Sequence, residues 1–257
     1  MNRTGLLIAL GIAAVVGIVF GFYPELDVTL GRLFYNSETR QFLDHIYPWL
    51  SWIRYGALWL IGLIAAVPLV ALLGKLIRPR RPLLMPGRAI ILLLATLVLG
   101  PGLLINTVLK DNWGRPRPGQ VIELGGDQRF VAWWNSSGTC LSNCSFASGD
   151  ASAAFWTLAP AALAPPAWRP VAYAASLTFA SVVGVLRMVF GGHFFSDVVF
   201  AGVFVFLVIW IAHGLLYRWP RTRLTDEGVD AWLERHVGAA QDRLARLFGA
   251  GRTRSDA

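Results

Sequence analysis

Residues 88–118 read RAIILLLATLVLGPGLLINTVLKDNWGRPRP, an apolar run that ends abruptly in a polar and cationic cluster. Residues 89–109 include no charged side chain. An α-helix needs about 20 consecutive apolar residues to cross the hydrocarbon core of a bilayer. The sequence therefore predicts a membrane-spanning helix here, with the cations of residues 110–118 at its boundary.

The whole chain has the composition of a membrane protein. Of its 257 residues, 55% are hydrophobic and 15% are charged, against roughly 25% charged residues in soluble proteins. The mean hydropathy is +0.54. The net charge of +8 could indicate nucleic-acid binding, but the basic residues lie in short loops beside apolar runs, which is typical of charges that set membrane orientation. We therefore expect the lipid bilayer as a partner, and no nucleic acid.

Six apolar runs are predicted to be transmembrane helices because of their length. They cover residues 5–22, 53–74, 88–109, 149–165, 171–189 and 197–217. The first run could be a signal peptide, but no cleavage site of small residues follows it, so we interpret it as a retained span. The sequence thus predicts an all-α integral membrane bundle of six helices over residues 1–218, with a cytoplasmic tail over 219–257.

Loop charges predict how these spans are oriented. The basic residues of the second loop and of the segment after the last span are Lys75, Arg78, Arg80, Arg81, Arg88, Arg218, Arg221 and Arg223. Because Lys and Arg concentrate in cytoplasmic loops, we expect both termini and the 75–88 loop in the cytoplasm of a bacterium. The loops at 23–50, 110–148 and 187–196 are then periplasmic, on the outer side of the inner membrane.

Three polar clusters fall on that periplasmic side. They read KDNWGRPRP over residues 110–118, SFASGD over 145–150 and RMVFGGHFFSD over 187–197. Lys110 and Arg117 combine a point charge with a planar guanidinium, which together complement the oxygens of a phosphate. A cation at a helix end can instead extend to the lipid interface without any chemical role. For Arg115 both interpretations stay open.

The second and third clusters add groups suited to binding and attacking a phosphate. Ser148 and Gly149 precede the fourth span, and free N–H groups at a helix N-terminus bind anions. The alternative is an N-cap serine and a turn glycine, with Asp150 complementing the helix dipole. His193 and Asp197 lie four residues apart and share one helical face, so the carboxylate could hold one imidazole nitrogen and leave the other free as a nucleophile.

Cys140 and Cys144, the only cysteines of the chain, lie in one polar loop. If that loop faces an oxidising compartment, a disulfide is expected. A metal pair lacks a third Cys or a His nearby in the sequence, and two separate thiols remain the alternative.

Residues 225–248 are predicted to form one amphipathic helix. Thr225 has the side chain of an N-cap, and Asp226 and Glu227 follow in the first turn, where the helix dipole favours anions. Apolar residues recur at near-helical spacing, and the basic residues between them suit an anionic cytoplasmic surface. Packing against a partner subunit is the alternative, and the oligomeric state stays open.

In order and spacing, the patterns KxxxxxxRP, SGx and RxxxxxHxxxD resemble the motifs of the type 2 phosphatidic acid phosphatase family, whose superfamily also contains haloperoxidases. The resemblance covers residues 88–217 and implies a six-helix core with a periplasmic active site at the helix ends. It assigns the substrate phosphate to Lys110, Arg117, Ser148, Gly149 and Arg187. It also implies that His193 attacks phosphorus to form a phosphohistidine, that Asp197 orients His193, and that fixed cations replace any metal or other cofactor.

Asp150 departs from the family pattern, in which a histidine at this position protonates the leaving oxygen. A carboxylic acid donates a proton only while it is protonated, and the neighbouring cations favour its ionised form. Three outcomes stay open: Asp150 works as a buried acid, the leaving group needs little protonation, or hydrolysis is slow. In carrying an acidic residue at this position, the chain resembles a subset of bacterial family members that act as lipid A phosphatases.

The expected function is hydrolysis of a lipid phosphate monoester or pyrophosphate at the outer face of the bacterial inner membrane. The candidate substrates are lipid A, undecaprenyl pyrophosphate, phosphatidylglycerol phosphate and phosphatidic acid. A lipid phosphotransferase with the same nucleophile and a catalytically weak lipid-binding protein are the alternatives. Soluble haloperoxidases with these motifs bind vanadate, but six apolar spans argue against that activity here.

Overall fold

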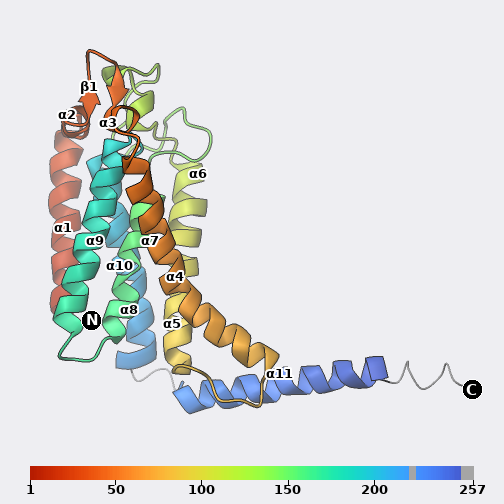
Figure 1. Ribbon diagram of the computed structural model, residues 1–257. Helices are drawn as coiled ribbons and strands as arrows, with labels where there is room; N and C mark the ends of the chain where they lie inside the picture. The colour runs from red at the N-terminus through yellow and green to blue at the C-terminus, as the bar shows by residue number, and fades with distance from the viewer. Residues whose placement is uncertain (220–223, 250–257) are drawn as a thin grey trace, which may run out of the picture.

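The computed structural model describes residues 1–219 and 224–249, and most of them are helical. In this part of the chain, five helices are long and apolar enough to cross a membrane. They are Arg3–Phe22 (α1), Leu50–Ile77 (α4), Gly87–Asn112, Arg169–Val189 (α9) and Phe195–Arg218. These helices run side by side as a bundle (Figure 1). The predicted all-α membrane bundle is therefore confirmed, with five candidate spans.

Two of the spans change helical geometry along their length. The span Gly87–Asn112 consists of α5 (Gly87–Leu97), the π-helical segment η1 (Val98–Leu109) and α6 (Lys110–Asn112). Pro101 has no N–H to donate to the carbonyl four residues earlier, which disfavours an ordinary α-helical turn at this point. The last span likewise consists of α10 (Phe195–His213) followed by the π-helical η4 (Gly214–Arg218).

The fourth predicted span, residues 149–165, is not among these five helices and is a broken segment made of α7 (Gly149–Phe155) and α8 (Leu158–Leu163). Pro160 accounts for the break, because it cannot donate to the carbonyl of Trp156. Ala151, Ala154 and Trp156 have no exposed surface, so this segment lies inside the bundle. The Trp156 indole N–H donates to the Leu93 carbonyl and to the Thr96 hydroxyl, at 3.1 Å each.

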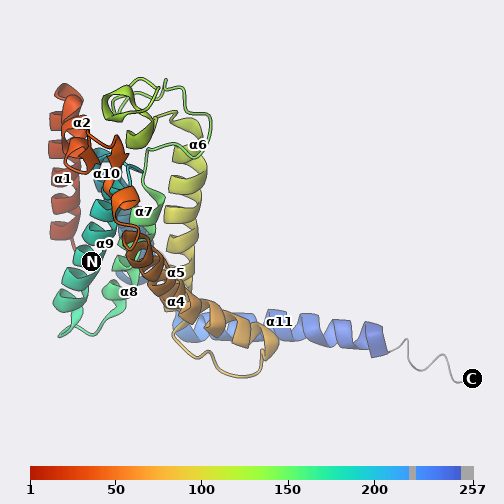
Figure 2. The same ribbon diagram turned by 45° about the horizontal axis from the view of Figure 1, so that its top comes forward.

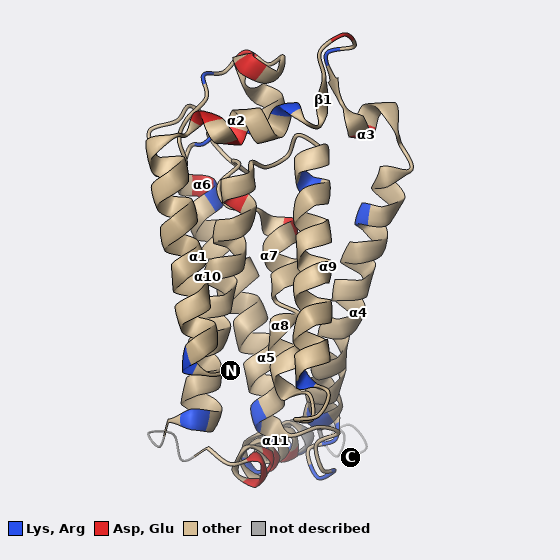
Figure 3. Cartoon of the chain, turned by 90° about the vertical axis from the view of Figure 1, so that its left-hand side faces the viewer, with Lys and Arg blue, Asp and Glu red and all other residues tan. Residues whose placement is uncertain are grey.

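Charged residues lie mainly near the two ends of the bundle and are almost absent from the middle of its described helices (Figure 3). On the outer helices, large apolar side chains face outward: Leu7 and Leu63 are 68% and 65% exposed, and Trp59 is 74% exposed. Exposed apolar surface of this extent is unfavourable in water and favourable in lipid. The distribution is that of a multi-pass membrane protein.

Short elements cover one end of the bundle, where α4 begins and α9 ends (Figures 1 and 2). They are α2 (Glu25–Arg32), the antiparallel strands β1 (Tyr35–Asn36) and β2 (Gln41–Phe42), α3 (Leu43–Ile46), and the 3-10 turns η2 (Pro118–Gln120) and η3 (Ile122–Leu124). A second apolar core of Val28, Phe42, Val121, Leu124 and Phe194 joins this cap to the start of α10. The cap is therefore packed onto the bundle as a fixed layer.

The N-terminus and helix α11 (Asp226–Gly249) lie at the opposite end, where α11 begins beneath the bundle and runs sideways beyond it (Figure 1). The Gly228 N–H donates to Thr225 Oγ1 at 2.9 Å, which confirms Thr225 as a cap. The predicted basic residues Arg221 and Arg223, and residues 250–257 of the predicted tail, lie outside the described residues.

Ion pairs fasten α11 to the ends of α4 and α5. Asp226 accepts from the backbone and the guanidinium of Arg88, at 2.9 Å each, and this pairing lowers the pKa of Asp226. The buried Lys75 ammonium lies 2.6 Å from Asp230. The helices also approach closely at Gly87, where an added Cβ would lie 2.6 Å from the Cβ of Val229.

Candidate active site

The three predicted clusters meet under the cap, at the end of the bundle opposite α11. Backbone contacts join them: the Gly119 N–H donates to the Gly191 carbonyl at 3.0 Å, and the Ser148 N–H to the Asp197 carbonyl at 3.3 Å. A Cβ added at Gly149 would lie 3.1 Å from Lys110 Nζ. The structure therefore brings residues about 40 to 80 positions apart in the sequence into one site, as their charges and spacing predict.

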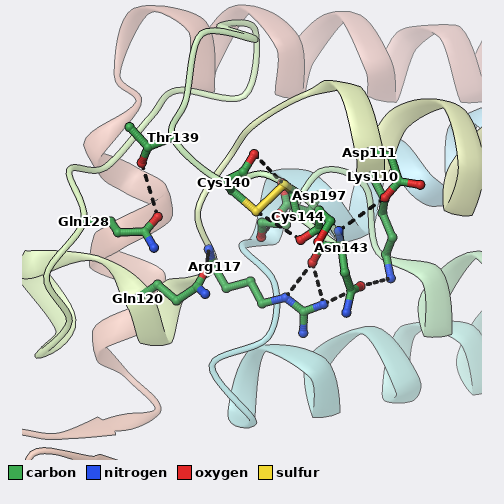
Figure 4. The surroundings of a disulfide bond; sticks show 12 residues. Lys110, Asp111, Arg117, Gln120, Gln128, Thr139, Cys140, Asn143, Cys144 and Asp197 are labelled. Carbon is green, nitrogen blue, oxygen red and sulfur yellow. Dashed lines mark hydrogen bonds between the residues drawn. A yellow bond between two sulfur atoms is a disulfide. The ribbon is translucent and has the colours of Figure 1, made fainter.

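Lys110 and Arg117 converge on a single residue, Asn143 (Figure 4). Asn143 Oδ1 accepts from Lys110 Nζ at 3.1 Å and from Arg117 Nη2 at 2.7 Å. The backbone carbonyl of Asn143 accepts from Nε and Nη2 of the same guanidinium, at 3.1 and 2.8 Å. Burial lowers the pKa of Arg117, although its guanidinium remains cationic at neutral pH. Asn143 was not predicted as a site residue, because an isolated asparagine in a loop does not indicate a function.

Asp150 lies between two arginines. Its Oδ2 accepts from Arg54 Nε at 2.8 Å and lies 3.3 Å from Arg187 Nε. Arg54 belongs to α4 and was not predicted as a site residue. Its position inside a predicted apolar span could have indicated it, since ionisable residues in such spans usually serve a function.

His193 is buried just before α10, with 2% of its surface exposed. Its Nδ1 lies 2.6 Å from the Ser145 carbonyl. A carbonyl only accepts hydrogen bonds, so Nδ1 carries the proton and Nε2 keeps a free lone pair. Burial lowers the pKa of His193 well below its ordinary value, and the nearby Arg187, Arg117 and Lys110 lower it further. The ring is therefore neutral at physiological pH, as a nitrogen nucleophile must be.

The predicted contact between His193 and Asp197 is not made. Nδ1 of His193 and Oδ2 of Asp197 are 3.9 Å apart, which is beyond hydrogen-bond distance. Asp197 instead accepts from the Ser145 hydroxyl and, at 2.8 Å, from the Phe194 N–H. Ser145 thus lies between the two groups: its hydroxyl binds the carboxylate, and its carbonyl binds the imidazole. The structure therefore links Asp197 to His193 through Ser145 and not by direct contact.

Arg115 binds the second carboxylate oxygen of Asp197, Oδ1. Its guanidinium pairs with Asp197 and, at 2.8 Å, with Asp27 of α2, and all three side chains are buried. Ser196 bridges the group, because its hydroxyl contacts Asp27 and accepts from Arg115 at 2.8 Å. Of the two open interpretations of Arg115, extension to the lipid interface is therefore wrong. The residue is an internal tie between the cap and α10.

Ser148 is the N-cap of α7, and Gly149 is its first residue. The Ser148 hydroxyl accepts from the Ala151 N–H at 3.4 Å, so this serine caps the helix. A Cβ at Gly149 would lie 2.5 Å from Asn106 Oδ1, so only glycine fits beside Lys110 without displacement. The capping interpretation is thus confirmed, and a role in phosphate binding stays a prediction.

Cys140 and Cys144 are joined by a disulfide whose Cα atoms are 5.7 Å apart (Figure 4). The bridge closes the short loop that carries Asn143. Among residues 1–219 and 224–249, no group of three or more His, Cys, Asp or Glu side chains is placed to hold a metal ion. The donors available to a ligand at this site are cations and N–H groups, a set that fits an anionic ligand.

Sequence comparison identifies the family. A family model described as the PAP2 superfamily matches residues 88–223, which is more than half of the chain. The chain belongs to the PAP2 superfamily. The matched region nearly coincides with residues 88–217, over which the three motifs resemble the type 2 phosphatidic acid phosphatases. The predicted family is therefore confirmed.

Three relatives of this chain carry the same description. A "Lipid A 4'-phosphatase" of Francisella tularensis subsp. novicida is 36% identical over 219 residues, covering 85% of this chain and 98% of the relative. Proteins with the same description from Rhizobium leguminosarum and Rhizobium etli are 42% and 43% identical, over 41% of this chain and 46% and 41% of their own lengths. No solved structure matches the chain.

Proposed function

We propose that this protein removes the 4'-phosphate of lipid A at the periplasmic face of a bacterial inner membrane, through a phosphohistidine formed on His193. The broader activity, that of a lipid phosphatase, follows from membership of the PAP2 superfamily and from the relative that aligns with almost its whole length. The choice of lipid A among lipid phosphates rests on the description that all three relatives share.

The observation that carries the mechanism is the buried, neutral His193, whose Nδ1 is fixed by the Ser145 carbonyl. Lys110, Arg117 and Arg187 would bind the phosphate oxygens and offset the negative charge that repels a nucleophile. Nε2 then attacks phosphorus, a P–N bond forms, and the P–O bond to the lipid breaks. The Ser145 carbonyl stabilises the positive charge that develops on the ring, because it accepts from Nδ1–H throughout.

Turnover requires two further steps. The leaving lipid oxygen takes up one proton, and a water then attacks the phosphohistidine to release inorganic phosphate and restore neutral His193. Asp150 stands where the family acid would act, but its carboxylate is paired with Arg54 and Arg187. This pairing supports a role in positioning Arg187 more than one in donating the proton.

We assign the orientation from the loop charges. The site lies at the end of the bundle opposite the N-terminus, α11 and the basic 75–88 loop (Figures 1 and 3). By the positive-inside rule, the end with α11 is cytoplasmic and the site is periplasmic. In a cysteine-free background, Arg80→Cys should resist a membrane-impermeant thiol reagent in intact spheroplasts. Labelling of this cysteine from outside would show that the orientation is the opposite one.

The decisive experiment uses purified protein in phospholipid nanodiscs with lipid A, undecaprenyl pyrophosphate, phosphatidylglycerol phosphate and phosphatidic acid as substrates. We expect release of the 4'-phosphate of lipid A as the fastest reaction. His193→Ala should abolish turnover, whereas the matched variant His45→Ala, at an exposed histidine of α3, should not. Full activity of His193→Ala would exclude the phosphohistidine. Transfer of the phosphate to an added alcohol or lipid, in place of water, would identify a phosphotransferase.

A further inference from the structure

Asn143 forms hydrogen bonds with two of the predicted phosphate ligands. It lies outside the three clusters, in the loop closed by Cys140 and Cys144. It makes four hydrogen bonds to Lys110 and Arg117, two of them through Oδ1 and two through its backbone carbonyl (Figure 4). A single amide oxygen thus fixes the point at which the two cations converge.

The pattern of donors shows what remains for a ligand. Of the five guanidinium N–H groups of Arg117, the one on Nε and both on Nη2 point to Asn143, which leaves the two on Nη1. Of the three ammonium hydrogens of Lys110, one is directed to Asn143 Oδ1, which leaves two. Asn143 therefore holds each cation in place and leaves donors free on both.

Asn143 is itself held firmly. Its φ of 51° lies in the left-handed region, which asparagine tolerates better than most residues. Its N–H donates to Asp111 Oδ1 at 3.3 Å, and the N–H of the next residue, Cys144, donates to the Lys110 carbonyl at 3.1 Å. The disulfide ties both sides of the same loop. Such a support is what a group needs if it is to orient other side chains.

We propose that Asn143 is a positioning residue that aims Lys110 and Arg117 at the substrate phosphate. The inference rests on the proposed function, because it takes these cations as the phosphate ligands. Long cationic side chains sample many rotamers when free, and ordering them on binding costs affinity. Asn143 removes that cost before the substrate arrives, without placing a negative charge that would compete with the phosphate.

The test compares Asn143→Gly with wild type in nanodiscs, using inorganic phosphate and orthovanadate as competitive inhibitors. Glycine keeps the left-handed backbone and removes the amide, so only the Oδ1 contacts are lost. We expect kcat/KM and the affinity for both anions to fall about 10- to 100-fold, since misplaced catalytic groups cost up to that much. Arg40→Gly is the matched control, because Arg40 also has a left-handed φ of 53° but lies in the exposed hairpin turn.

Asn143→Asp gives a second, independent measurement. It keeps an oxygen acceptor and tolerates the same backbone, but its charge should compete with the phosphate and weaken inorganic phosphate binding more than it lowers kcat. A residue that only shapes the turn predicts wild-type inhibition constants for both variants, and that result would overturn the proposal. Wild-type activity of His193→Ala would instead overturn the proposed function, so the two failures are distinguishable.

Discussion

The carboxylate of Asp197 and the guanidinium of Arg115 form an ion pair in which neither side chain has any exposed surface. Asp27 of the cap binds the other end of the same guanidinium at 2.8 Å. The burial of charged groups is costly unless each one is paired, so the three residues depend on one another. A buried network of charges therefore binds Ser145, whose carbonyl contacts the proposed nucleophile His193.

Replacing Arg115 with Met should destabilise the protein strongly. The substitution leaves Asp27 and Asp197 buried without a counter-charge, which typically costs about 3–5 kcal/mol. Unfolding in a detergent titration measures the loss. Arg129→Met, at an exposed arginine of the same loop, should change stability by less than about 0.5 kcal/mol. Equal stability of the two variants would show that the buried tie contributes little.

Asp150→Asn separates positioning from acid catalysis. The amide keeps the shape and loses the charge that holds Arg187, so kcat/KM should fall about tenfold, the equivalent of one charge-assisted hydrogen bond. The fall should be the same for substrates with good and poor leaving groups. A loss confined to poor leaving groups would identify Asp150 as the proton donor. Asp127→Asn, at an exposed position of the cap, is the control.

The pH dependence should reflect the depressed pKa of His193. An ordinary histidine becomes protonated as the pH falls through about 6.5, but burial and three cations keep this ring neutral to lower pH. The phosphorylation step in a single turnover should therefore stay constant between pH 7.5 and 6 and decline only below that interval. A decline centred near pH 6.5 would contradict the assignment.

The same shift has a consequence for stability. Below the unfolded-state pKa, the unfolded chain binds a proton that the folded ring does not, so this site lowers stability as the pH falls from about 6.5 toward the folded pKa. His193→Gln, which cannot titrate, should lose less stability over this range than wild type. Parallel pH profiles for the two proteins would argue against a depressed pKa.

The disulfide should support phosphate binding through Asn143. Cys140 and Cys144 are four residues apart, and closing so short a loop is expected to contribute about 2 kcal/mol in the chain-entropy model. The double variant Cys140→Ser/Cys144→Ser should lose roughly that stability and bind inorganic phosphate more weakly. A reducing agent should weaken binding by wild type and leave the double variant unchanged. If the reducing agent changes phosphate binding by neither protein, the disulfide does not support the phosphate site.

Gly87→Ala should loosen α11 without affecting hydrolysis. The new methyl group would lie 2.6 Å from the Cβ of Val229, so one helix must shift. Hydrogen exchange of the α11 amides should become faster, while turnover at the other end of the bundle stays the same. Gly62→Ala is the matched control, since nothing lies within 4 Å of its added Cβ. Equal exchange in the two variants would mean that the contact at Gly87 is dispensable.

The positions of five spans could be predicted because length and apolar composition alone decide whether a helix can cross a bilayer. The break within residues 149–165 and the burial of this segment inside the bundle could not be predicted in the same way. Pro160 gave a signal for the break, but the burial of Trp156 depends on which helices surround it. Hydropathy reports how apolar a segment is, and it does not distinguish a lipid-facing helix from one enclosed by protein.

The convergence of the three clusters was also predictable, since each one follows or precedes a span on the same side. Their partners were not. Arg54 lies 96 residues from Asp150, and Asp27 lies 88 residues from Arg115, so only the folded chain shows these pairs. The spacing of His193 and Asp197 predicted that the two side chains lie near each other, but His193 precedes α10, so they do not share a helical face, and Ser145 stands between them.

Asp27 and Arg54 both lie before residue 88, where the region shared with the superfamily begins. The recognisable family segment is therefore not a self-sufficient unit in this protein. A chimera that joins residues 88–223 to the first two spans of another family member would keep the second carboxylate of Arg115 and the α4 arginine of Asp150 only where those spans carry counterparts of Asp27 and Arg54. Asp27 and Arg54 therefore couple residues 1–87 to the motif-bearing segment, so a functional exchange between homologues must transfer both parts of the chain.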